Sequence, residues 1–584
     1  MTVHAEEPDP ENHSTATIDP SSHPEETGWV RRAWRRYIDL LPRLGLAGSR
    51  SSQLHEEGRA EYQPEPLRPL NELERYRLQI AVWLGSVGTI LIALGGVGAG
   101  AMPVVGNPLW SVPGINVLAR MLHSTTVTVF VGIGILVIAW LLLASFVLSQ
   151  RAAYLKRIPL RTYWRIFLLW VFPLAITAPM FTQDIYSYLA QGSITAQGID
   201  PYSAGPVDIL GVHDPLARSV PLMWAHSPAP YGPIALGYGA IISIITQGNI
   251  MLGVFAHRLV SIAGLTLAGW ALTRLAQRCG VAPQMAMWVG ILNPLTLLHL
   301  VAGIHNEALL LGLLLAGMEF VLRGVDHFQR PMISRWFLII SGTILVTCAG
   351  MIKVTALMAL GFVGVAIARW WGAKLNHLAL AAVLTGAIAT ATAVFFSLIT
   401  GVKFGWITSQ GGAAEIISWM SLSTLAGLAS SFLGSVLGLG DHQTAALLIF
   451  RAVGIAVGAF WVIRMLWAAF RGRIHPVGGL GVATLLLVIF FPVVHPWYLL
   501  WAILPLAAWA NRPIFHFATI VYSVAFSFFI LPRGLGLPPE TVFFIYAMSV
   551  ILFVVLVFGA WRYLKPRQKL RHALAMPNPR HHTS

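Results

Sequence analysis

The sequence predicts an all-α polytopic membrane protein, with about 14 transmembrane helices and further re-entrant or interfacial helices in its outer loops. Hydrophobic residues make up 56% of the 584 residues, mean hydropathy is +0.69, and only 11% of residues are charged. A soluble globular protein has roughly 25% charged residues. The charges also concentrate at the chain ends, so residues 79–561 carry only 33 charges over 483 residues. That is too little polar surface to cover a soluble domain of this size.

The charge distribution divides the chain into three parts. Residues 1–78 are predicted to form a cytoplasmic tail, which is disordered over residues 1–28. The Arg-rich segment 29–46 fits either an interfacial helix or a solvated linker. Residues 79–561 form the membrane domain, and residues 562–584 form a basic cytoplasmic tail. The N-terminus lacks the basic stretch and short apolar core of a cleavable signal peptide.

Apolar runs of spanning length follow one another along the membrane domain. A spanning helix needs about 20 mostly apolar residues. The clear candidates are 80–101, 125–148, 163–181, 254–275, 284–303, 306–323, 335–352, 354–371, 378–400, 444–468, 478–493, 496–511, 514–531 and 541–561. Two further segments, 232–250 and 419–438, are doubtful because they are richer in Gly, Ser and Thr.

Basic residues set the predicted orientation, because cytoplasmic loops carry an excess of Lys and Arg. The basic loop 151–165 follows the second span, so this loop and the N-terminus are predicted to lie inside. If both doubtful segments crossed, Arg274 and Arg471 would face outside. We therefore predict fourteen crossings of the plasma membrane with both termini in the cytoplasm. Eight of the ten acidic residues between 79 and 561 then fall outside.

Composition also excludes several classes of function. The pI near 10.1 does not indicate a nucleic-acid-binding protein, because the basic residues stand singly between apolar runs and form no continuous face. The two cysteines, Cys279 and Cys348, give neither a disulfide framework nor a metal-binding cluster. No set of carboxylates or histidines has ligand spacing, so neither a metal nor another cofactor is indicated.

The longest loop of the membrane domain, residues 182–231, is predicted to hold a site on the outer face. Its length of about 50 residues contrasts with the short loops elsewhere, and such loops are usually functional. Asp184, Tyr188 and Gln191 are spaced i, i+4, i+7 and so share one face of a helix. A carboxylate, a phenol and an amide on that face suit a sugar hydroxyl. The alternative is that Asp184 only favours the positive end of a short helix.

Further polar residues are predicted to gather on the same side. Lys353 interrupts an apolar hairpin, and a lysine at membrane depth is by default a functional candidate, with snorkelling as the alternative. The other candidates are Asp200, Tyr202, His226, Tyr231, His305, Asn306, Glu307, His495, Trp497, Tyr498 and Arg533. Taken singly, each has a structural explanation, such as a turn or an interfacial aromatic belt. The prediction of a site rests on their convergence.

These residues resemble the actinobacterial polyprenol-phosphomannose-dependent α-1,6-mannosyltransferases, within the C-type membrane glycosyltransferase superfamily. The matching segments are, in order within residues 180–505, QDIYSYLAQG with GIDPYSAGP, SPAPYGPIAL, NPLTLLHLVAGIHNEALLLGLLLAG, GMIKVTAL and HPWYLLW. One departure is that the long loop follows the third predicted span, whereas in such enzymes it often follows the first. Two added N-terminal spans would explain this offset.

The resemblance implies a reaction and roles for the candidate residues. Mannose would pass from polyprenyl phosphate mannose to the α-1,6-mannan of a cell-envelope glycolipid, of lipomannan or lipoarabinomannan type, outside the membrane. Asp184 would act as general base in a single inverting displacement. The donor phosphate would be bound by Lys353, His305, His495 and Arg533. The sugar and acceptor would be bound by Tyr188, Gln191, Asp200, Tyr202, His226, Tyr231, Asn306, Glu307, Trp497 and Tyr498. Donor, acceptor and membrane lipid are the expected partners.

Two alternative functions stay open at this point. The same fold could transfer another lipid-phosphate-linked sugar, such as arabinofuranose. The chain could also be a polytopic transporter or lipid flippase. Transporters often contain internal repeats with broken helices in matching positions, and no convincing repeat relates the two halves of this sequence.

Overall fold

Apolar helices make up nearly all of the described structure. The computed structural model describes residues 70–103, 107–148, 158–326, 330–409 and 416–575. All of them belong to the larger of two compact units, residues 44–584. No strand occurs within these ranges. The segments 1–28 and 29–46, predicted as a disordered region and as an interfacial helix or linker, lie outside the described residues.

Eight of the described helices are long and apolar enough to cross a membrane. They are α3 (Glu72–Ala99), α5 (Leu122–Ala144), α12 (Ile250–Arg278), α15 (Glu307–Asp326), α16 (Met332–Gly350), α18 (Leu375–Thr400), α21 (Gln443–Phe470) and α25 (Pro539–Ala575). A ninth candidate is broken, with Pro283–Ile291 and Pro294–Ala302 bent by 50° relative to each other. The predicted all-α polytopic fold is confirmed.

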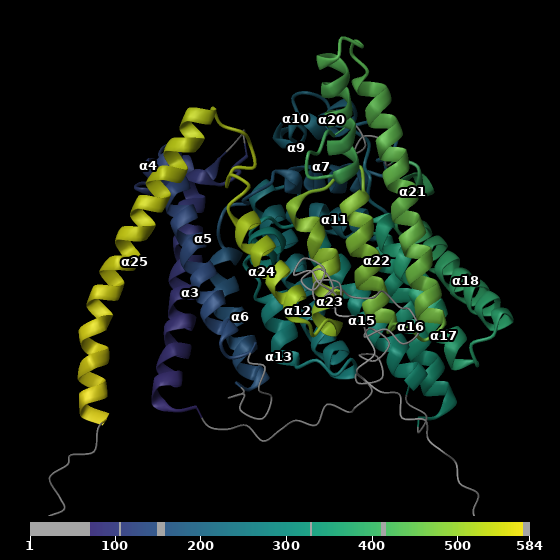
Figure 1. Cartoon of the computed structure of the whole chain (residues 1–584). Helices are drawn as coiled ribbons and strands as arrows, with labels where there is room; N and C mark the ends of the chain where they lie inside the picture. The colour runs from purple at the N-terminus through teal and green to yellow at the C-terminus, as the bar shows by residue number, and fades with distance from the viewer. Residues whose placement is uncertain (1–69, 104–106, 149–157, 327–329, 410–415, 576–584) are drawn as a thin grey trace, which may run out of the picture. The chain divides into compact units, whose positions relative to one another are not determined.

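Shorter helices stand beside the long ones (Figure 1). They are α6 (Leu160–Ala175), α17 (Met358–Trp370) after η5 (Val354–Leu357), α22 (Pro476–Phe490), α23 (Leu500–Trp509) after η7 (Pro496–Leu499), and α24 (Pro513–Ser527). These five correspond to the remaining predicted spans, and the count of fourteen crossings stays a prediction. The doubtful segments form α11 (Pro233–Thr246) and α20 (Leu422–Val436), both shorter than the roughly 20 residues that a crossing needs.

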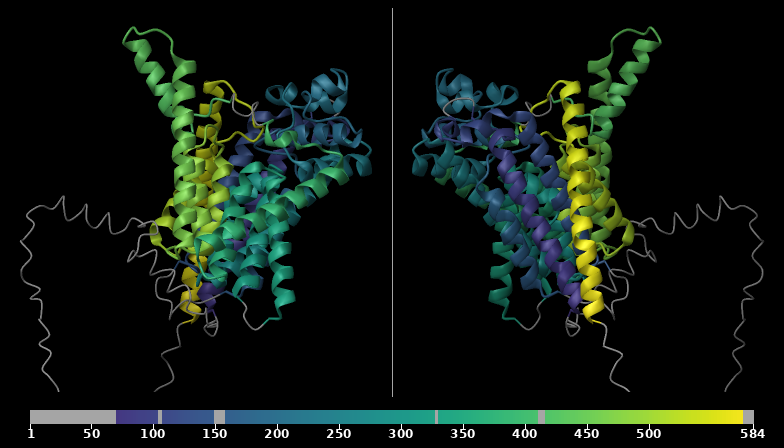
Figure 2. Two further views of the ribbon diagram at one scale, coloured as in Figure 1. Left: turned by 90° about the vertical axis from the view of Figure 1, so that its right-hand side faces the viewer. Right: turned by 90° about the vertical axis from the view of Figure 1, so that its left-hand side faces the viewer.

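The long loop lies at one end of the helix bundle. It contains α7 (Asp184–Ala196), α8 (Pro206–Leu210), α9 (Pro215–Ser219) and α10 (Leu222–Ala225). Figures 1 and 2 show α7, α9 and α10 at one end of the bundle. The N-terminus of α3 and the C-terminus of α25 lie at the opposite end. The helix α13 (Pro283–Ala286), which soon follows the basic end of α12, lies at the end away from this loop. The long loop and the basic end of α12 thus lie at opposite ends of the bundle, in agreement with the predicted topology. Which end faces the cytoplasm stays a prediction.

The helix α15 is packed against two neighbours by close backbone contact. A side chain on Gly312 would clash with the Gly264 carbonyl of α12, and one on Gly317 would clash with the Gly342 carbonyl of α16. Small residues at such positions let helix backbones approach each other in a membrane. The 20 residues of α15 extend about 30 Å at 1.5 Å per residue. This helix therefore links the loop end of the bundle to the basic end.

Candidate active site

Asp184 is the first residue of α7, and the segment before it is held by backbone hydrogen bonds. The Met180 N–H donates to the Ala302 carbonyl at 3.0 Å, and the Phe181 N–H donates to the Pro532 carbonyl at 2.7 Å. Phe181 also has a positive φ of 67°, which is uncommon for a bulky residue. Strained backbone of this kind persists only where its surroundings fix it, and it clusters at functional sites. The chain thus enters α7 in a fixed direction.

A second strained turn, residues 303–306, leads into α15 beside the first. Ile304 has a φ of 57°. The His305 side chain that follows it is 1% exposed. The Asn306 amide oxygen accepts a hydrogen bond from the Tyr238 hydroxyl of α11. The next residue, Glu307, begins α15 with its carboxylate fully buried. This turn therefore brings three predicted site residues to the N-terminal end of α15.

Lys353 is the charge partner of the buried Glu307. Its ammonium donates to Glu307 Oε1 at 2.5 Å. It also lies 4.9 Å from the ring centroid of Tyr498, 5.6 Å from that of Trp501 and 6.0 Å from that of Tyr231. Burial has the largest single effect and lowers the pKa of Lys353. Glu307, Tyr498 and Tyr231 together raise it by more, so the pKa stands well above its ordinary value. Lys353 is therefore a charged group inside an aromatic cage.

The Asp184 carboxylate lies in the same cluster. Its Oδ1 accepts a hydrogen bond from the Trp224 indole at 3.1 Å, and its Oδ2 is 3.8 Å from His305 Nδ1. Burial raises the pKa of Asp184, while Lys353 and the Trp224 hydrogen bond lower it, and the pKa remains above its ordinary value. The side chain is still 23% exposed. A carboxylate that is accessible and more basic than usual has the properties of a general base.

Stacked rings form one wall of the cluster. The Trp497 ring stacks on His305 with centroids 4.1 Å apart and on His495 with centroids 4.6 Å apart. Burial, together with nearby Lys353, lowers the pKa of His305 well below its ordinary value and that of His495 to about 4. Both imidazoles are then neutral at physiological pH. Each can donate one N–H to a ligand, but neither supplies the positive charge that would stabilise a bound phosphate.

A cavity of about 270 Å³ opens between these residues. It is lined by Asp184, Trp224, Pro230, Tyr231, Lys353, Val354, Thr355, Ile416, Ile455, Phe491, Pro492, Val493, His495, Trp497, Tyr498 and Trp501. The lining has two parts. Carboxylate, ammonium, imidazole and phenol groups make one part polar, and aliphatic and phenyl side chains make the other apolar. Such a cavity suits a ligand that carries both a polar head and a hydrocarbon chain.

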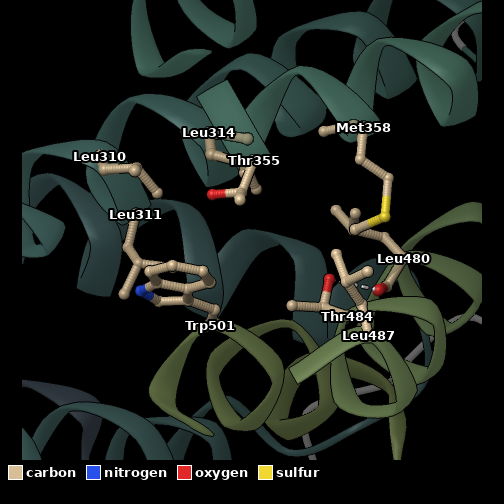
Figure 3. A pocket seen from close by; sticks show the side chains of 11 residues that line it. Leu310, Leu311, Leu314, Thr355, Met358, Leu480, Thr484, Leu487 and Trp501 are labelled. Atoms are coloured by element: carbon tan, nitrogen blue, oxygen red, sulfur yellow. Dashed lines mark hydrogen bonds between the residues drawn. The ribbon is translucent and has the colours of Figure 1, made fainter. Parts of the chain in front are cut away.

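A smaller apolar cavity of about 20 Å³ adjoins the first (Figure 3). Thr355 and Trp501 line both cavities. The rest of its lining comes mainly from leucines of α15 and α22 with Met358 of α17: Leu310, Leu311, Leu314, Leu480 and Leu487. The apolar surface therefore continues from the large cavity into the helix bundle.

Gln191 and Tyr188, which were predicted to share a helix face with Asp184, have different surroundings. Gln191 lines a third, small cavity together with Asp184. Tyr188 instead packs edge-on against the Tyr231 ring with centroids 5.3 Å apart, and it is not among the described residues that line these three cavities. Ser187, one residue earlier, takes the cavity position. The helical spacing predicted the face, but packing against α11 and the Tyr231 loop decided which side chain reaches the cavity.

Asp200 and Tyr202 have structural partners. Asp200 accepts a hydrogen bond from the Tyr202 N–H at 3.0 Å and pairs with Lys403 at 3.2 Å. The Tyr202 hydroxyl donates to the Tyr231 carbonyl at 2.8 Å. This turn fixes Tyr231, and neither Asp200 nor Tyr202 is among the described residues that line the large cavity.

His226 and Arg533 lie away from the large cavity. His226 pairs with Asp208 at 2.7 Å, and its side chain is 65% exposed. The Arg533 guanidinium donates to the Gly98 carbonyl at 3.3 Å. Neither residue belongs to the cavity lining within the described part of the chain. Their predicted roles in binding acceptor and phosphate therefore lack support from the geometry.

Two tryptophans that the sequence did not single out complete the site. Trp224 bonds to Asp184, and Trp501 faces Lys353. Trp224 lies within the long loop, and Trp501 lies one helical turn after Trp497. Their positions in the sequence could have indicated a role in the site, but an aromatic residue near a membrane surface is usually an interfacial anchor.

Metal binding has no clear location in the described ranges. They contain no group of three or more His, Cys, Asp or Glu residues arranged to hold a metal ion. That the reaction needs no metal stays a prediction.

Comparison with known proteins identifies the family. The sequence model of one protein family, the α-(1→6)-mannopyranosyltransferase N-terminal domain, matches residues 82–369. The family model of the MptB C-terminal domain matches residues 423–558. The chain is 48% identical over 577 residues to α-(1→6)-mannopyranosyltransferase B of Corynebacterium glutamicum, which covers 93% of this chain and 95% of that protein. The chain belongs to the α-(1→6)-mannopyranosyltransferase family.

Other members of this mannosyltransferase family are also similar over most of the chain. A probable α-(1→6)-mannopyranosyltransferase of Mycolicibacterium smegmatis is 42% identical over 476 residues, or 79% of this chain and 84% of that protein. An α-(1→6)-mannopyranosyltransferase of Mycobacterium tuberculosis is 41% identical over 516 residues, or 82% and 86%. No solved structure matches. The predicted family and the predicted enzyme class, a mannosyltransferase, are confirmed, and the transporter alternative gains no support.

Proposed function

We propose that the protein transfers mannose from polyprenyl phosphate mannose to the 6-hydroxyl of an α-1,6-mannan acceptor. The acceptor would belong to a lipomannan-type or lipoarabinomannan-type glycolipid on the outer face of the plasma membrane. One observation carries the proposal: Asp184 and Lys353 line one cavity whose other part is apolar. The α-(1→6)-mannopyranosyltransferase names of the relatives support the α-1,6 linkage.

The cavity residues fit the parts of such a donor. The aromatic rings Tyr231, Trp497 and Tyr498 offer faces on which a sugar can pack. The apolar lining and the adjoining leucine cavity offer a surface for the hydrocarbon next to the phosphate. An ammonium has three donors. Lys353 donates one to Glu307, and a second can reach the Tyr498 hydroxyl. At least one donor of Lys353 is then left for a phosphate oxygen.

These positions support a reaction in one step. Asp184 accepts the proton of the acceptor hydroxyl while its oxygen forms a bond to the anomeric carbon. The bond from that carbon to the phosphate oxygen breaks, and its electron pair leaves with the polyprenyl phosphate. The Lys353 ammonium stabilises the growing negative charge. A β-linked donor gives an α-linked product in this single displacement, and the enzyme forms no covalent intermediate.

Mannose transfer by purified protein tests the proposal. The wild type and Asp184→Asn are supplied with β-mannosyl phosphopolyprenol and an α-1,6-mannobioside. We expect the wild type to add mannose through a 1→6 linkage, and the variant to be slower by at least about 100-fold because it lacks the base. Asp208→Asn is the matched control, since Asp208 pairs with His226 outside the large cavity.

The possible results separate the donor from the base. Equal rates for wild type and Asp184→Asn would remove Asp184 from the mechanism. No transfer from this donor by a folded wild type, together with transfer from an arabinofuranosyl phosphopolyprenol, would replace mannose by the other sugar.

A further inference from the structure

A small polar cavity meets the large one at Asp184. It measures about 30 Å³ and is lined by Asp184, Ser187, Gln191, Trp224, Ser227, Pro228, Pro230, Tyr231 and Ser409. Four of these residues, Asp184, Trp224, Pro230 and Tyr231, also line the large cavity. The hydrogen-bonded pair of Asp184 and Trp224 therefore lines two cavities that differ in character. One is large and partly apolar, and the other is small and contains three serines and a glutamine.

Two buried polar groups in the small cavity have no partner. Ser187 is 4% exposed and Gln191 is 3% exposed. The Ser187 hydroxyl and the Gln191 amide oxygen make no hydrogen bond within the described residues. Buried polar groups are almost always hydrogen-bonded. By contrast, the Ser409 hydroxyl of the same cavity donates to the Ala229 carbonyl at 2.8 Å. The unpaired groups therefore indicate a ligand.

The helix α7 presents these groups together with the base. Asp184, Ser187 and Gln191 are spaced i, i+3, i+7, which places them along one face. All three line the small cavity. A ligand bound there would touch the carboxylate that accepts the proton. This cavity is thus placed to hold the nucleophile.

The volume limits what can enter. A cavity needs roughly 10–15 Å³ to hold one water molecule, so about 30 Å³ admits about two heavy atoms. A pyranose ring is too large. A primary hydroxymethyl group, which is one carbon and one oxygen on an arm outside the ring, fits. A secondary hydroxyl is attached to a ring carbon and would have to bring part of the ring with it.

We propose that Ser187 and Gln191 form the subsite for the primary hydroxymethyl group of the acceptor sugar, and that this subsite determines the 1→6 linkage. The proposal rests on the proposed function. The Ser187 hydroxyl and the Gln191 carboxamide, which carries both donors and acceptors, hold the oxygen of this group beside Asp184. The proton passes to the Asp184 carboxylate as this oxygen bonds to the anomeric carbon, and the electron pair of the broken bond leaves with the phosphate.

Acceptor analogues measure the role of the subsite. The acceptors are octyl α-1,6-mannobioside and its analogue in which the terminal primary hydroxyl is replaced by hydrogen. For the wild type, we expect the inhibition constant of the deoxy analogue to exceed the KM of the parent acceptor by about tenfold, the value of one hydrogen bond. In Ser187→Val and in Gln191→Leu, this ratio should fall clearly below tenfold, because each variant removes one of the two groups that hold the hydroxyl. The donor KM should stay within about twofold, because these two residues are not among the described lining of the large cavity.

A matched control comes from the same helix. Ser193→Val makes the same substitution on α7 outside the lining of both cavities, and it should keep the wild-type ratio. If Ser187→Val does not fold, as judged by its thermal unfolding in detergent, Ser187→Thr adds one methyl group and keeps the hydroxyl. It should raise the acceptor KM and leave the donor KM unchanged.

The outcomes distinguish this subsite from the proposed function. A folded wild type that transfers no mannose from β-mannosyl phosphopolyprenol contradicts the proposed function and the subsite with it. A wild type that transfers mannose while both variants keep its tenfold ratio overturns the subsite alone. An equal rise of donor KM and acceptor KM in the variants also overturns it, since the residues would then shape the whole site.

Discussion

Two buried glutamates of α15 have opposite surroundings. Glu319, near the basic end, accepts hydrogen bonds from Arg278 and Arg323 at 3.0–3.2 Å, and Arg278 also pairs with Asp326 at 2.7 Å. Glu307, at the other end of the helix, has one cationic partner, Lys353, and its second oxygen has no hydrogen bond within the described residues. One network is fully paired and the other is not.

The difference separates a structural ion pair from one that is a candidate for function. A buried charge is costly unless paired and hydrogen-bonded, and the arginines satisfy that need for Glu319. The Glu307 and Lys353 pair instead lies in a turn next to a cavity, with donors left over. An incompletely paired network beside a cavity is a candidate binding site, whereas a complete one holds helices together.

The largest expected effect breaks the pair at the site. Lys353→Met should lower kcat by about 100-fold, because it removes the cation that stabilises the leaving phosphate. It also leaves Glu307 buried without a partner, so its Tm should fall. The double variant Lys353→Met with Glu307→Gln should regain Tm but not activity. Recovery of activity in the double variant would reduce Lys353 to a structural role.

The matched change at the other end should have the opposite result. Glu319→Gln removes the charge that Arg278 and Arg323 share, so we expect a lower Tm. The kcat per folded molecule should stay within about twofold, since additive effects hold for distant sites. A large loss of kcat at unchanged Tm would show that the two ends of α15 are coupled.

The pH dependence of kcat/KM sharpens the assignment of roles within the site. A general base must be deprotonated, and the pKa of Asp184 lies above its ordinary value of 3.8. Activity should therefore be lost as pH falls through a value higher than that of a free aspartate. A profile measured from about pH 4 to about pH 9 should show no limb at the ordinary histidine pKa near 6.5, because His305 and His495 are already neutral there. A limb near 6.5 that disappears in His305→Asn would instead make that histidine the titrating group.

A smaller effect is expected from the tryptophan beside the base. Trp224→Phe removes the indole hydrogen bond that lowers the pKa of Asp184. The acid limb should move to higher pH, while the rate well above the limb should fall by less than about tenfold. Trp110→Phe is the control, because Trp110 is 63% exposed and lies outside the cavity lining. An unmoved limb would mean that the indole does not act on the base.

The smallest effect is expected at the other acidic candidate of the loop. Asp200→Asn removes the ion pair with Lys403, whose side chain is 78% exposed, and such pairs contribute about 0–1 kcal/mol. The asparagine can still accept the Tyr202 N–H. Activity should stay within about twofold in the mannose transfer assay. A loss of about 100-fold would move the base from Asp184 to Asp200.

Hydropathy and charge were enough to predict most of the helices and the convergence of the site. Asp184, His305, Lys353 and His495 each stand within two residues of a helix start. The even number of predicted crossings between them places those starts at one end. The 50° break in the span 284–303 was not predicted, although Asn293-Pro294 is a turn signal. There Asn293 accepts a hydrogen bond from the Leu295 N–H at 3.0 Å.

Which side chains pair with each other could not be predicted from the sequence. Glu307 and Lys353 are 46 residues apart, and both were predicted to bind substrate groups without reference to each other. Which two charges meet depends on how α15 packs against α16, and hence on glycine contacts such as Gly317 with Gly342. The same reason explains why the Trp224 contact with Asp184 was missed, since it depends on the fold of the loop.

The placement of charges on α15 also restricts how this enzyme can move. Its roughly 30 Å length matches the hydrocarbon core of a bilayer, and it carries a paired glutamate near each end. A shift of one helical turn along its axis would separate both Glu307 from its lysine and Glu319 from Arg278 of α12. The helix is therefore held in place at both ends, and any opening that admits a substrate must come from elements that are not anchored in this way.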